Sequence, residues 1–236
     1  MKRVIITAVA VVLVGSLMLL AVSEWQNAFT LISLAVLVGV LALSFLYFEV
    51  SVIGTKQIAL IATLSAFTAV SRIVFAPIPN VQPVTFLTAL CGLVLGPFPG
   101  FLVGCTSAFV SNIFLGQGPW TSWQMFAWGL IGLFCGLWGK NGKKPSPVAF
   151  GLACVGFSFL FGWIMNLWQA VTYLRPFTWF GFLLTYVTSL LFDLMHAAGS
   201  FLLAILFYEK FYKILHRYKR RMDVTYIEPP LPKEAS

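Results

Sequence analysis

Charged residues are scarce in this chain. Only 9% of its 236 residues are Asp, Glu, Lys or Arg, whereas 60% are hydrophobic. A soluble domain normally carries about a quarter charged residues, so the composition excludes a soluble globular fold. The apolar runs are continuous and as long as a membrane-spanning helix requires, whereas a membrane barrel would show short alternating segments. The sequence therefore predicts an all-α, polytopic membrane protein.

Residues that support metal or redox chemistry are also few. The chain has two histidines and four cysteines, and the cysteines lie singly within apolar runs, without a CxxC pair or a histidine at metal-ligand spacing. We expect them to pack as small apolar residues, and we expect no metal site. No glycine-rich phosphate-binding loop is present, so we expect neither an ATPase site nor a bound cofactor.

Proline, glycine and polar clusters divide the chain into eight predicted spans. The domain boundaries that follow are two N-terminal transmembrane helices in residues 1–50, a six-helix substrate-binding membrane domain in 51–208, and a basic interfacial segment with a disordered tail in 209–236. The first span, residues 4–21, is either a cleaved signal peptide or a retained helix; its length favours retention. The last span is predicted to end at Phe207, before the alternating aromatic and basic residues of YEKFYKILHRYKRR. Such a segment suits an interfacial helix attracted by anionic lipid.

The positive charges predict the orientation of the chain. The net charge of +8 is concentrated in the N-terminus, the short loop 139–147 and the C-terminal segment, while the opposite side holds only Arg175, with Arg72 near the end of its span. Positive loops stay in the cytoplasm, so both termini of this multi-pass cell-membrane protein are predicted to be cytoplasmic. Because these charges set topology, nucleic acid is not an expected partner.

Two polar loops, Ala76–Pro83 and Leu115–Ser122, are then predicted to face the outside. We expect the prolines of the first loop to hold it extended. Amides and indoles gather in and near these loops and could line a pocket for an uncharged or bulky polar solute. The candidate solute-binding residues are Arg72, Asn80, Gln82, Asn112, Gln117, Trp120, Trp123, Gln124, Trp128, Asn166 and Gln169. Each also has a structural interpretation: interhelical hydrogen bonding for amides, an interfacial belt for tryptophans, and snorkelling for Arg72.

Asp193 and His196 are the acid–histidine pair of the last span, in the stretch FDLMHAAGS. Their i, i+3 spacing predicts that both lie on one helix face. A buried polar pair or a ligand contact is the favoured interpretation, so both join the candidate binding residues. An intramembrane enzyme that uses them as an acid–base pair stays an alternative, although no nucleophile motif accompanies them. A scaffold whose polar groups only hold helices together is a third possibility.

Ala62 and Ala66 are four residues apart in the third predicted span. Small residues at this spacing let another helix approach closely. The pair therefore predicts either packing within the chain or a docking face for a separate membrane subunit.

The order of several segments resembles a known family. ALIATLSAFTA, FAPIPNVQPVTF, GPFPGF, SNIFLGQGPWTSWQMFAWGLIG and FDLMHAAGS, between Lys56 and Tyr208, resemble the substrate-binding S component of energy-coupling-factor (ECF) vitamin transporters. The resemblance implies a vitamin-binding membrane subunit that is not an enzyme and binds its solute near the extracellular side. It also implies that Ala62 and Ala66 dock onto a membrane coupling (T) subunit driven by two cytoplasmic ATPase subunits.

The resemblance also points to a vitamin, but it does not include the segments outside the six spans. The segment 77–128 is most similar to S components assigned to cobalamin, with riboflavin, pantothenate or a queuosine precursor as alternatives. The two extra N-terminal spans and the basic tail depart from the family pattern.

Overall fold

The computed structural model describes residues 35, 38–39, 41–42, 54–140 and 142–222. Within these residues the regular structure is helical throughout and contains no strand, which confirms the predicted all-α class. The predicted N-terminal pair of helices lies outside the described residues, apart from five positions. The helices are α3 (Thr55–Phe75), α4 (Pro83–Leu95), α5 (Pro97–Leu115), α6 (Trp120–Trp138), α7 (Pro147–Tyr173) and α8 (Trp179–Met222).

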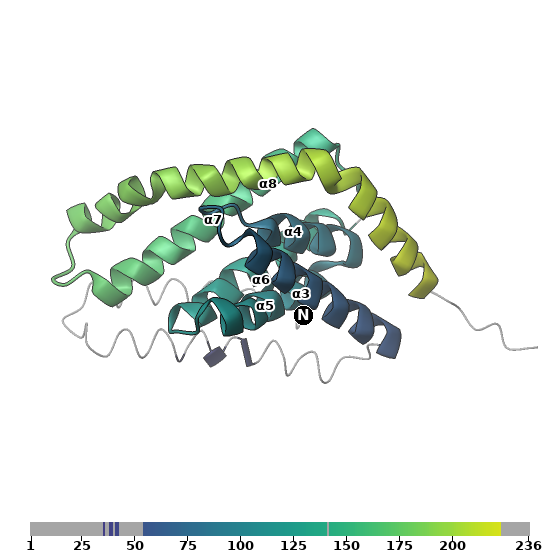
Figure 1. Cartoon of the computed structure of the whole chain (residues 1–236), viewed down its shortest axis with the longest axis horizontal. Helices are drawn as coiled ribbons and strands as arrows, with labels where there is room; N and C mark the ends of the chain where they lie inside the picture. Colours follow the sequence, from purple (N-terminus) through teal and green to yellow (C-terminus); the bar gives the residue numbers. More distant parts are fainter. Residues whose placement is uncertain (1–34, 36–37, 40, 43–53, 141, 223–236) are drawn as a thin grey trace, which may run out of the picture.

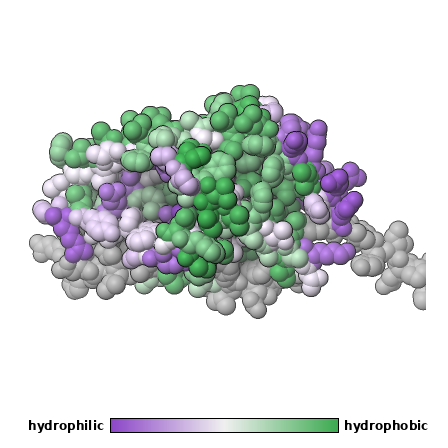
Figure 2. All heavy atoms as spheres, viewed as in Figure 1, coloured by the Kyte–Doolittle hydropathy of each residue, from purple (hydrophilic) through white to green (hydrophobic). Residues whose placement is uncertain are grey.

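Four of these helices, α3, α5, α7 and α8, are long and apolar enough to cross a membrane. Large apolar side chains such as Leu183, Val187 and Leu191 are exposed along α8, and Figure 2 shows apolar surface across much of the molecule. Apolar side chains exposed along such helices are suited to contact with lipid. The chain is therefore a multi-pass membrane protein.

Helix α4 forms the centre of the bundle. It is 13 residues long, and every residue except Leu95 is buried. It contacts α3, α5, α6, α7 and α8 and lies in the middle of the cartoon in Figure 1. A helix that is apolar all round is stable only when neighbours cover every face, which explains this position.

Glycines allow α4, α5 and α6 to pack backbone against backbone. A Cβ atom at Gly92 or Gly100 would meet the carbonyl oxygen of Gly132, and one at Gly104 would meet that of Trp128. Small residues at such crossings permit contact distances that larger side chains prevent. This packing fixes the first half of α5 against the middle and second half of α6.

Helix α8 combines the last predicted span with the basic segment that was expected to form an interfacial helix. It continues without a break for 44 residues, about 66 Å at about 1.5 Å per residue, and so exceeds the thickness of a bilayer. Between Phe201 and Met222 there is no glycine or proline to end the helix, so the apolar and basic parts form one element. Figure 1 shows α8 lying along α7 and bending toward its C-terminal part. Whether that part lies at the interface stays a prediction.

The up-and-down order of the helices creates two chemically different ends. The C-terminal ends of α3, α5 and α7 gather with the N-terminal ends of α4, α6 and α8. The opposite end holds the loop 139–147 and the basic C-terminal part of α8, where Lys219 Nζ donates to the carbonyl oxygen of Val94 at 2.8 Å. Most of the candidate binding residues lie in the first end.

Candidate functional site

Arg72 lies at the centre of a polar network. Its side chain extends from the last turn of α3 and is only 7% exposed. Nη1 donates to Ser111 Oγ and to Asn112 Oδ1, each at 2.6 Å, and Nη2 lies 3.4 Å from Gln124 Oε1. Within the described ranges no carboxylate forms an ion pair with this guanidinium. The charge is therefore held by neutral oxygen atoms.

The amides of α5 and α6 extend this network toward the loop between them. Asn112 Nδ2 donates to Gln124 Oε1 at 2.8 Å and to Thr121 Oγ1 at 3.0 Å. The Thr121 hydroxyl in turn donates to Gln117 Oε1 at 2.9 Å. Four predicted residues, Arg72, Asn112, Gln117 and Gln124, are thus brought together.

Trp128 joins Arg72 to α4 and α8. The Arg72 guanidinium lies 4.9 Å from the centroid of the indole ring, within the range of a cation–π contact. The indole Nε1–H donates to Thr85 Oγ1 at 3.0 Å, and the same oxygen lies 2.8 Å from His196 Nε2. Phe161 stacks on the indole with centroids 4.2 Å apart. Because Trp128 is fully buried, a solute could reach its ring only after side chains move.

Three buried polar atoms of this region have no hydrogen-bond partner. They are Arg72 Nε, His196 Nδ1 and Gln82 Oε1. Gln82 is the residue before α4 and lies about one turn from Thr85. Buried polar groups in native proteins are nearly always paired, so unpaired atoms at one end of the bundle are suited to receive a polar ligand.

Asp193 makes different contacts from His196, although the two share a helix. Ser189 Oγ donates to Asp193 Oδ2 at 3.1 Å, and Asn166 Nδ2 donates to Ser189 Oγ at 2.7 Å. This second cluster joins α7 to α8. The two side chains therefore serve separate interhelical contacts.

The loop 76–82 is folded rather than extended, so the expectation drawn from its prolines was wrong. Successive backbone hydrogen bonds run from Ile78 N to Phe75 O and from Val81 N to Ile78 O. Asn80 adopts a φ of 51°, in the left-handed region, and its Nδ2 donates to the carbonyl oxygen of Phe192. Prolines fix φ, but they permit turns as readily as extended backbone.

The remaining candidates pack against α7 or lie on it, apart from the Arg72 network. Trp120 meets Trp168 edge to face at 6.1 Å, and Trp123 is buried beside Trp168 and Met165. Gln169 is exposed on α7. The structure does not connect these three to the Arg72 network.

Sequence reasoning missed the small hydroxyl residues that complete the Arg72 network and the second cluster. They are Thr85, Ser111, Thr121 and Ser189. A hydroxyl in a helix commonly bonds to the preceding turn of its own backbone, as Ser111 also does to Ser107. Their type alone therefore gives no signal of a site.

Ala62 and Ala66 are both exposed on α3, whereas Ile61, Ser65, Thr68, Ala69 and Arg72 form its buried face.

The four cysteines are buried and unpaired. In the part of the chain that the structure describes, no group of three or more His, Cys, Asp or Glu side chains could hold a metal ion.

Comparisons with known proteins connect this fold to a transporter family. The family model described as "ECF-type riboflavin transporter, S component" matches residues 52–213. A UPF0397 protein of Aliivibrio fischeri strain MJ11 is 26% identical over 188 residues, which cover 73% of this chain and 97% of that protein. A UPF0397 protein of Aliivibrio salmonicida is 28% identical over 141 residues, covering 53% of this chain and 76% of its own.

No solved structure matches the chain. The family match begins at residue 52, shortly before α3, and ends within α8. It spans well over half of the chain, including all of α3 to α7. The chain therefore belongs to the ECF-type riboflavin transporter S-component family, the substrate-binding membrane subunits of vitamin transporters.

Proposed function

We propose that this chain is the high-affinity vitamin-binding subunit of an ATP-driven ECF-type uptake transporter. It captures its solute at the extracellular side and releases it inside after docking onto a coupling subunit. The end that carries Arg72, Asn112 and Gln124 is the solute-binding end. The basic end then lies in the cytoplasm, as the positive-inside rule predicts.

The observation that carries this proposal is the incomplete polar network around Arg72. A buried guanidinium without a carboxylate is costly in a membrane, and charged groups there usually serve a function. Three unpaired polar atoms at this end of the bundle are available to bond to a solute: Arg72 Nε, His196 Nδ1 and Gln82 Oε1. The indole of Trp128 supplies apolar surface beside Arg72.

Cobalamin is the solute that we propose first. Its many amides match a site built from amide side chains. Its bulk requires the site to open, and a solute can reach the buried Trp128 only if the site opens in this way. Riboflavin is the second candidate, because the matching family model is described by that vitamin. Its flat ring would stack on an indole.

Docking onto the coupling subunit is assigned to Ala62 and Ala66. Their exposure on α3 supports this role over packing within the bundle. The acid–base alternative for Asp193 and His196 gains no support from their separate contacts.

The substitution Gln82→Ala tests the proposed function. Gln82 Oε1 has no partner in the structure, so its loss should cost the ligand-free protein little stability. If the solute supplies the partner, affinity should fall roughly fivefold, since a lost hydrogen bond costs about 1 kcal/mol. Equilibrium titration of the purified protein with cobalamin and with riboflavin measures this change.

Gln57→Ala, at the opposite end of α3, is the matched control and should leave affinity unchanged. Binding of neither vitamin by the folded wild-type protein would contradict the choice of solute. Unchanged affinity in the Gln82 variant would contradict the placement of the site.

A further inference from the structure

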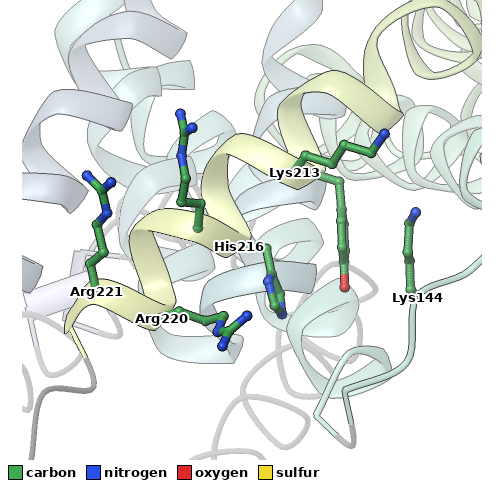
Figure 3. Close-up of a pocket in the computed structure, with 7 residues that line it drawn as sticks. Lys144, Lys213, His216, Arg220 and Arg221 are labelled. Atoms are coloured by element: carbon green, nitrogen blue, oxygen red, sulfur yellow. The ribbon is translucent and has the colours of Figure 1, made fainter.

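A basic pocket lies at the end of the bundle away from the Arg72 network. It has a volume of about 470 Å³ and is formed by the loop before α7 and the last turns of α8. Its lining residues are Lys144, Tyr212, Lys213, His216, Arg217, Arg220 and Arg221, and Figure 3 shows five of them labelled around the cavity. The vitamin site shares none of these residues.

The positive charge of this pocket is largely uncompensated. Lys144 Nζ pairs with Glu209 Oε2 at 2.8 Å. The described part of the chain contains no other ion pair. Among the residues that the structure describes, no carboxylate forms an ion pair with Lys213, Arg217, Arg220 or Arg221. Four cations held together on two turns of one helix repel one another, so a bound anion would stabilise the arrangement.

Side-chain contacts between the loop before α7 and α8 fix the shape of the pocket. The Lys144 ammonium lies 5.2 Å from the centroid of the Tyr212 ring, and Tyr212 stacks on His216 with centroids 5.8 Å apart. Tyr208, one turn earlier, donates to the carbonyl oxygen of Pro145 at 2.9 Å. These contacts tie the loop to α8, so both sides of the pocket hold a defined position.

Apolar surface continues to the edge of the pocket. Val148 is 54% exposed at the start of α7, and Leu206 and Ile214 are 60% and 42% exposed on α8. Figure 2 shows the hydrophilic residues of this end gathered beside the apolar surface of the bundle. A ligand that combines an anionic head with apolar chains fits this boundary better than a wholly soluble anion does.

We propose that this pocket binds the phosphate headgroup of an anionic phospholipid, with the lipid chains lying along the apolar surface of α7 and α8. Basic pockets at the cytoplasmic ends of membrane helices are suited to such headgroups. The lipid would hold the end of α8 at the membrane surface. This site is independent of the vitamin site.

Two charge-matched variants of the full chain test the proposal. Lys213→Gln/Arg217→Gln/Arg220→Gln removes charge from the pocket, whereas Lys140→Gln/Lys143→Gln/Lys210→Gln removes the same charge from exposed positions outside it. Native mass spectrometry of delipidated protein in detergent micelles measures binding of phosphatidylglycerol. Phosphatidylcholine with the same chains, inorganic phosphate and glycerol 3-phosphate are the comparison ligands.

The pocket variant should bind phosphatidylglycerol roughly tenfold or more weakly than wild type, while the control variant changes far less. Phosphatidylcholine should bind weakly to all three proteins. If the triple pocket variant fails to fold, Arg217→Gln and the charge-retaining Arg217→Lys replace it, and only the former should lose affinity.

Three results would overturn the proposal. Equal losses in the two triple variants would show diffuse attraction rather than a site. Equal binding of phosphatidylcholine and phosphatidylglycerol would show that the positive charge of the pocket does not select the lipid. Displacement of phosphatidylglycerol by inorganic phosphate or glycerol 3-phosphate at similar concentrations would assign the pocket to a soluble phosphorylated ligand.

Discussion

At the scale of single residues, the site depends on side chains that bond to two partners at once. Thr85 Oγ1 accepts from Trp128 Nε1 and also meets His196 Nε2. Asn112 accepts from Arg72 and donates to Gln124 and Thr121. Loss of one such residue leaves two buried groups unpaired, and each unpaired group costs free energy. These residues therefore determine both the shape and the stability of the site.

Thr85→Val tests this dependence. Valine matches threonine in shape but removes the hydroxyl, so the Trp128 N–H and the His196 ring nitrogen lose their shared partner. We expect the free energy of unfolding to fall by about 1–3 kcal/mol. Thermal unfolding in detergent, compared with wild type, measures the change.

Thr63→Val is the control for this substitution. Thr63 is exposed on α3, and its hydroxyl bonds to the carbonyl oxygen of Ala59 in the same helix. We expect a change of less than about 0.5 kcal/mol for such a surface position. Equal stability of the two variants would mean that the Thr85 bridge contributes nothing to the fold.

At the scale of elements, α3 presents different residues on its two faces, which fits the two roles that we propose for it. One face directs Arg72 into the bundle, and the other exposes Ala62 and Ala66. A helix that carries a site residue on one side and a docking surface on the other can couple solute binding to docking. Coupling of this kind is the central feature of the proposed transport mechanism.

Ala62→Leu/Ala66→Leu tests the docking face. The larger side chains should prevent close approach of a coupling helix and abolish co-purification with the coupling subunit and its ATPases, because such interfaces require small residues. Vitamin affinity should stay unchanged, since both positions lie outside the Arg72 network.

Ala62→Ser/Ala66→Ser keeps the residues small and should preserve docking. Intact co-purification of the leucine variant would refute the assignment of this face. A loss of vitamin affinity in the same variant would instead place these alanines in the structure of the binding site.

The proline and glycine clusters from which the spans were predicted also mark the starts of several helices in the structure. Pro83, Pro97 and Pro147 each begin a helix, as expected where the missing N–H costs nothing. The change to basic residues marks the end of the predicted span but not the end of the helix, because lysine and arginine are good helix formers. The fold of the loop before α4 was also missed, because proline spacing does not choose between turns and extended backbone.

At the scale of the whole molecule, the bundle has one amide-rich end and one basic end. The sequence identified the amides and the basic segment, and the helix order brings each set together. It could not identify the partners that complete the network, such as Thr85 and Ser111, because they come from helices distant in sequence. The basic pocket likewise requires the loop before α7 to meet α8.

Vitamin binding is the claim on which this account depends. The most direct test is mass spectrometry of the small molecules released from the full chain after purification from cells supplied with a vitamin mixture. We predict that a single vitamin, cobalamin first and riboflavin second, is released in an amount comparable to that of the protein. A folded, monodisperse protein that carries no vitamin, and takes up none from the mixture, would contradict the account.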